Sequence, residues 1–82
     1  METYMNIYKL TQDQVVGYDT FDSAIVAAPN EDYAKSLHPT ENDLDWGSDC
    51  WAKSPEDVKV ELIGAALAHI KSGVILASYN AG

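Results

Sequence analysis

Cys50, His38 and His69 are the side chains whose types could together perform chemistry. A cysteine beside a histidine base can act as a nucleophile, and the same three residues with one acid could hold zinc. They lie 12 and 19 residues apart, spacings that match no paired-ligand motif, and no local signature surrounds Cys50. We therefore predict that the protein is not an enzyme and needs no metal or cofactor. A Cys50-dependent enzyme remains an alternative.

A calcium loop is a second possibility, because Glu41, Asp43 and Asp45 recur at every second residue, as the first ligands of such a loop do. Trp46 stands where the loop needs a glycine, and Ala52 stands where the closing glutamate belongs. The pattern therefore does not predict a dedicated calcium loop.

The stretch GYDTFDS, residues 17–23, contains two more carboxylates, Asp19 and Asp22. Carboxylates three residues apart can share an ion, so Tyr18, Asp19 and Asp22 could form a small-ligand or metal site. Aspartate and serine side chains also bond to nearby backbone amides and thereby fix turns. We interpret the stretch as a turn that enters an apolar strand, with Tyr18 and Phe21 at the edge of the core, and keep the ligand site as an alternative.

The charge balance is strongly acidic, with 13 acids, five lysines, no arginine and a formal net charge of −8. Affinity for nucleic acid comes mostly from basic contacts to phosphates, so direct binding to DNA or RNA is not expected. The same field attracts basic partners and speeds their association, although an acidic surface can also serve solubility alone.

The acids concentrate between residues 41 and 57, where only Lys53 opposes them and where Trp46 and Trp51 flank Cys50. Long connections in compact domains are often functional, and tryptophan is enriched at binding hot spots. Alternatively, one or both tryptophans close the end of the core. The predicted partner-binding residues are Asp43, Asp45, Trp46, Asp49 and Trp51, with Asp19 and Asp22 as a second choice.

Eighty-two residues predict one domain, residues 1–82, with a thin core. The single cysteine excludes an internal disulfide. No apolar run approaches the roughly 18 residues of a membrane span, and the first ten residues do not resemble a signal peptide. These features predict a cytoplasmic protein.

Residue patterning predicts strands over 3–11, 23–28, 58–62 and 74–79, and a helix over 31–38 that is capped by Asn30. Tyr33, Ala34 and Leu37 are expected on the inner face of that helix. A single turn at 55–57 should lead into the third strand. A second short helix or turn is expected over 65–72, with Leu67 and Ile70 inward and Gly73 as its stop.

The predicted fold is α+β, with a four-stranded antiparallel sheet in ββαββ order and one short helix on one face. Residues 74–79, VILASY, are apolar on both faces. That composition predicts a central strand.

Three segments of the chain, YDTFDSAIVAAPNEDYAKSLHP, VKVELIGA and GVILASYNAG, carry a family resemblance. They resemble a small uncharacterised protein family of bacteriophages and prophages, which often has tyrosine at the position of Phe21 and phenylalanine at that of Tyr79. The match omits residues 40–53. It implies a phage-associated accessory protein, and small acidic phage proteins are often inhibitors of bacterial defence systems, anti-CRISPRs among them.

These observations predict a protein-binding inhibitor of a host complex that binds nucleic acid, of the defence or CRISPR type. Aspartates along one face could imitate a phosphate backbone and occupy a basic groove. The expected partner is a host protein or complex with a basic surface, and neither nucleic acid nor a membrane is expected to bind directly.

Overall fold

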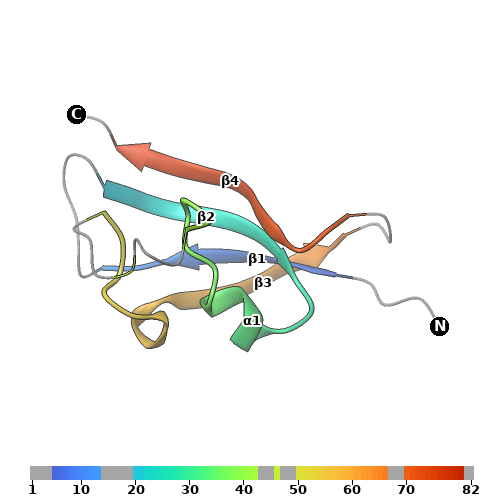
Figure 1. The fold of residues 1–82 in the computed structure, drawn as a ribbon. Coiled ribbons are helices and arrows are strands. Elements are labelled where there is room, and N and C mark those ends of the chain that lie inside the picture. The colour runs from blue at the N-terminus through green and yellow to red at the C-terminus, as the bar shows by residue number, and fades with distance from the viewer. Residues whose placement is uncertain (1–4, 14–19, 43–45, 47–49, 67–69, 81–82) are drawn as a thin grey trace.

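The fold is built on one antiparallel sheet of four strands. The computed structural model describes residues 5–13, 20–42, 46, 50–66 and 70–80. The strands are β1 (Asn6–Thr11), β2 (Thr20–Ala28), β3 (Lys59–Ala65) and β4 (Gly73–Asn80), in the spatial order β3-β1-β2-β4 (Figure 1). The predicted α+β fold with a four-stranded antiparallel sheet is confirmed.

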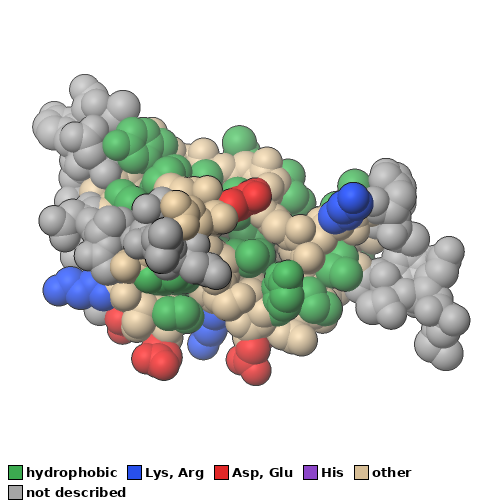
Figure 2. All heavy atoms as spheres, viewed as in Figure 1, with side chains coloured by type: hydrophobic (Ala, Val, Ile, Leu, Met, Phe, Trp, Pro, Cys, Tyr) green, Lys and Arg blue, Asp and Glu red, His purple; other side chains and the backbone are tan. Residues whose placement is uncertain are grey.

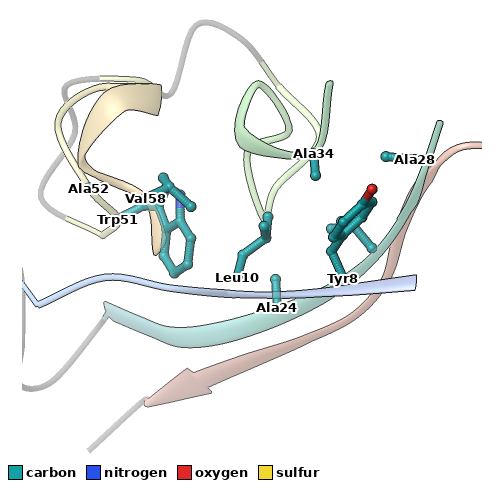
Figure 3. Close-up of a cluster of buried hydrophobic side chains, with 9 residues drawn as sticks. Tyr8, Leu10, Ala24, Ala28, Ala34, Trp51, Ala52 and Val58 are labelled. Atoms are coloured by element: carbon teal, nitrogen blue, oxygen red, sulfur yellow. The ribbon is translucent and has the colours of Figure 1, made fainter. Parts of the chain in front are cut away.

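The strand register decides which side chains share a face. Leu10 lies opposite Val60 on one side and Ala24 on the other, and Tyr8 lies opposite Leu62 and Val26. Because side chains alternate between the two faces of a strand, these rows place the apolar residues of three strands on one face. Tyr8, Leu10 and Ala24 point towards the helix and the long connection (Figure 3), whereas Leu62, on the edge strand β3, is 59% exposed.

The one α-helix among the described residues, α1 (Glu31–Lys35), covers this face, as Figure 1 shows. Its start was predicted correctly, because the Asn30 side chain accepts a hydrogen bond of 2.8 Å from the backbone N–H of Tyr33. Ala34 is buried in the core, whereas the predicted inner residue Tyr33 is 42% exposed. The helix ends at Lys35, three residues before His38, where the backbone N–H groups of Ser36 and Leu37 donate to the carbonyls of Tyr33 and Ala34 in a tighter last turn.

The connection from α1 to β3 completes the core. Trp51, Ala52 and Val58 from this segment are buried against Leu10 and Ala24 (Figure 3). A short 3-10 helix, η2 (Pro55–Asp57), leads into β3 as expected, and the Ser54 hydroxyl donates to an Asp57 carboxylate oxygen at 3.0 Å. The connection therefore contributes to folding.

One sequence-based prediction about the C-terminal part was wrong. β4 is an edge strand, not a central one, because β3 and β4 pair on opposite sides of the β1–β2 hairpin. The helix or turn expected over 65–72 does not begin at Ala65, which belongs to β3, and Ala66 donates its backbone N–H to the Met5 carbonyl at 2.8 Å. Residues 67–69 of that segment lie outside the described residues. Gly73 begins β4 with a φ of 141°, and Leu67 lies outside the described residues.

Glu41 occupies left-handed backbone space, with a φ of 61°. A residue with a Cβ atom pays about 1 kcal/mol for this conformation, and glycine does not. We expect Glu41→Gly to raise the free energy of unfolding by about 0.5–1 kcal/mol relative to Glu41→Gln, which removes the charge but keeps the Cβ atom. Urea denaturation followed by circular dichroism measures the difference. Equal free energies of unfolding for the two variants would show that the left-handed backbone at Glu41 does not cost stability.

Candidate functional site

The two tryptophans proposed as contact residues both pack against the core. Trp51 is completely buried, with an exposed fraction of 0%. A partner cannot reach its indole in this structure, contrary to the predicted contact role, because the thin core uses this large ring to fill its end. Trp46 is partly buried and packs against the same cluster.

Asp22 is the one acidic contact candidate among the residues that the structure describes. It is exposed and lies at an irregularity of β2, between Phe21, which is opposite Tyr79, and Ser23, which is opposite Ser78. It is therefore a strand residue and not part of a turn before the strand. Tyr18 lies outside the described residues. So do the other acids predicted to bind a partner, which are Asp19, Asp43, Asp45 and Asp49.

His38 is a structural residue of the core and is 1% exposed. Its Nδ1 accepts the backbone N–H of Thr40 at 3.1 Å, and the Thr40 hydroxyl lies 2.9 Å from the same atom. An Nδ1 that accepts this hydrogen bond carries no proton itself.

The described part of the chain brings together no chemical site around Cys50. Cys50 is partly buried, and its backbone carbonyl accepts the N–H of Phe21 at 2.7 Å. No three histidine, cysteine or acidic side chains gather among the described residues as metal ligands would, and no pocket is found among those residues. His69 lies outside them.

Sequence reasoning missed the surface along β4. Ile75, Leu76 and Tyr79 expose 52%, 64% and 48% of their side chains. Figure 2 shows green and tan atoms along the upper rim of the molecule. The signal was present in the sequence, because residues 73–80 contain no charged residue in a chain that has 18. The sequence alone did not distinguish this exposed edge from a buried strand, because a lack of charged residues is typical of both.

No protein-family model, no curated protein and no solved structure matches this chain. Within the described residues, no helix has both the length and the apolar character to span a membrane.

The described acids lie mainly on the surface. The described residues include eight acids, of which Asp57 is half-buried. The other seven are exposed: Asp13, Asp22, Glu31, Asp32, Glu41, Glu56 and Glu61. Solvent-exposed acids are available to an approaching basic surface. Electrostatic attraction of a partner therefore does not depend on the acidic connection alone.

One of these acids, Asp13, is neutralised within the chain. Lys59 Nζ lies 2.8 Å from Asp13 Oδ2, and this hydrogen bond and the attraction of the ammonium group lower the pKa of Asp13 below its ordinary value. The pair stabilises the fold above the ordinary pKa of an aspartate, and that small contribution is lost as the pH falls through the lowered pKa.

We expect Asp13→Asn and Lys59→Gln each to lower the unfolding midpoint slightly at neutral pH, because exposed ion pairs contribute little. Below the lowered pKa the variants and the wild type should converge. Urea denaturation at several pH values tests this, and additive losses in the double variant would show that the two residues do not act as a pair.

Proposed function

We propose that this chain is a protein-binding module whose partner presents a basic surface. The observation that carries the proposal is the charge balance, −8 with no arginine, together with the exposure of the described acids. Such a field speeds association with a basic protein and disfavours acidic competitors. The exposed apolar residues of β4 add a surface that a protein partner can bury.

The partner that fits best is a host complex that binds nucleic acid, because such complexes present basic grooves that an acidic protein can occupy. The resemblance to phage and prophage proteins supports a bacterial defence complex, of the CRISPR type, as the target. Binding in place of nucleic acid would inhibit the complex. The chain would then act as an inhibitor without any catalytic step.

Affinity capture from a bacterial lysate at two salt concentrations tests the proposal. Screening shortens the range of charge interactions from about 10 Å at 0.1 M salt to about 3 Å at 1 M. We expect basic nucleic-acid-binding proteins, identified by mass spectrometry, to be retained at low salt and largely lost at high salt. Added double-stranded DNA should displace them if both occupy one groove.

The control is a variant in which the exposed acids Glu31, Asp32 and Glu56 become glutamine or asparagine, which preserves side-chain size. Retention should fall in this variant. A partner whose retention does not change with salt, or with these substitutions, would argue against binding through charge.

A further inference from the structure

The edge of β4 is built differently from the opposite edge of the sheet. Edge strands have backbone N–H and C=O groups that no neighbouring strand pairs, and proteins usually protect them with charged residues. β3 follows this rule with Lys59 and Glu61, both exposed, although it also exposes Leu62 and Ile63. β4 carries no charge and exposes the side chains of Leu76 and Tyr79. Of the two edges, β4 is therefore the one suited to pair with another strand.

The segment from Leu76 to Asn80 lies between one irregularity in the pairing with β2 and the end of β4, and a second irregularity, at Asp22, falls opposite Ser78 and Tyr79. The register with β2 is irregular at Ile75, because Val74 lies opposite Val26 and Leu76 lies opposite Ile25. From Leu76 onward, each β4 residue has its own partner in β2. This segment of extended backbone is about 17 Å long.

The charge next to this segment indicates the chemistry of the added strand. Asp22 is exposed on β2 beside the Ser78 and Tyr79 positions. Neighbouring strands lie about 4.8 Å apart, so an added strand would run about 10 Å from the Asp22 backbone. An arginine or lysine side chain on that strand can cover this distance towards the carboxylate.

A second copy of the chain fits this edge less well. Antiparallel pairing of two β4 strands about Ser78 would place the two Asp22 residues near the symmetry axis, with like charges on both sides. Each copy would also bring a net charge of −8. Charge complementarity therefore favours a basic strand from a different protein.

We propose that Leu76–Asn80 binds an extended segment of the protein partner as a fifth strand, and that an arginine or lysine of this segment pairs with Asp22. Backbone hydrogen bonds supply affinity in this mode of recognition, and alternate side chains supply specificity. The inference rests on the proposed function, since it identifies where the basic partner binds.

The test uses a synthetic peptide, acetyl-Thr-Val-Thr-Arg-Thr-Val-Thr-amide, which reads the same in both directions and so allows parallel or antiparallel pairing. An analogue with glutamate in place of arginine is the charge control. In NMR titration of the labelled full chain, we expect shift changes at the amides of β4 and around Asp22. The arginine peptide should bind at least tenfold more tightly than the glutamate peptide.

Leu76→Lys and Leu62→Lys form a matched pair of variants. Each variant adds one positive charge at an exposed leucine. Leu76 lies on the β4 edge and is 64% exposed, and Leu62 lies on the β3 edge and is 59% exposed. We expect Leu76→Lys to weaken binding of the arginine peptide about tenfold and Leu62→Lys to leave it within twofold. Asp22→Asn should weaken it about threefold and remove the preference over the glutamate peptide.

Three outcomes would overturn the inference: no β4 shifts at millimolar peptide, equal weakening by both lysine variants, or a dimer in light scattering that Leu76→Lys abolishes. Affinity capture from a lysate distinguishes failure of the β4 binding site from failure of the proposed binding to a basic partner. If Leu76→Lys still retains basic proteins in a salt-dependent way, the proposed function stands and the β4 site falls.

Discussion

Replacing Trp51 with alanine is expected to destabilise the protein by about 3–5 kcal/mol, the usual cost of removing a large buried aromatic side chain. Trp51 is fully buried and lies in the same cluster as Leu10, Ala24 and Val58. A domain of this size has a total stability of roughly 4–12 kcal/mol. The substitution would therefore remove a large share of it. Urea denaturation followed by far-UV circular dichroism measures the loss.

Trp46→Ala is the matched comparison, because Trp46 lies in the same connection but is only partly buried. We expect it to cost about 1–2 kcal/mol, less than half of the loss at Trp51. If Trp51→Ala does not fold, Trp51→Phe keeps most of the ring and should remain folded with a smaller loss. A loss at Trp46 equal to or greater than that at Trp51 would contradict the core role assigned to Trp51.

The second large effect is expected at His38, where replacement by alanine should cost about 2–4 kcal/mol. The ring fills buried space and meets Trp46 edge-on, with 5.1 Å between ring centroids. Its Nδ1 is also the acceptor for the Thr40 backbone N–H. The variant would lose packing and leave that backbone donor without its acceptor, and both losses are costly.

His38→Asn separates the two contributions, because an asparagine side-chain oxygen can accept the Thr40 N–H while the ring is lost. We expect its stability to lie between those of the wild type and His38→Ala. Thr40→Val removes the hydroxyl contact to His38 Nδ1 at 2.9 Å and the acceptor of the Asn42 backbone N–H at 3.3 Å, and it should cost about 1 kcal/mol. Equal stability of His38→Asn and His38→Ala would show that the hydrogen bond contributes little.

Local signals in the sequence were sufficient for most secondary structure. Asn30 before two acids predicted the start of α1, because a capping side chain and the helix dipole act within one turn. The alternation of residues 58–62 predicted β3, and the apolar run of residues 23–28 predicted the second half of β2. These interactions join residues close in the chain, so their pattern can be read without knowing the fold.

Assignments of residues to the surface or the core were less successful. An acidic connection with two tryptophans predicted a contact surface, but Trp51 fills the core. Composition shows only that a tryptophan is present, whereas its burial depends on whether the sheet leaves a space that the ring fits. The uncharged β4 was expected at the centre of the sheet for a similar reason, since apolar composition is common to buried strands and to binding edges.

The sequence by itself determined the strand-forming segments, the helix start, the acidic charge balance and the α+β class, because each depends on local pattern or on composition. Only the tertiary structure decided the strand order, the exposure of the β4 edge, and the burial of Trp51 and His38. Strand order depends on pairings between residues far apart in the chain. Many such pairings satisfy the same local pattern, and the packing of side chains on one shared face selects among them.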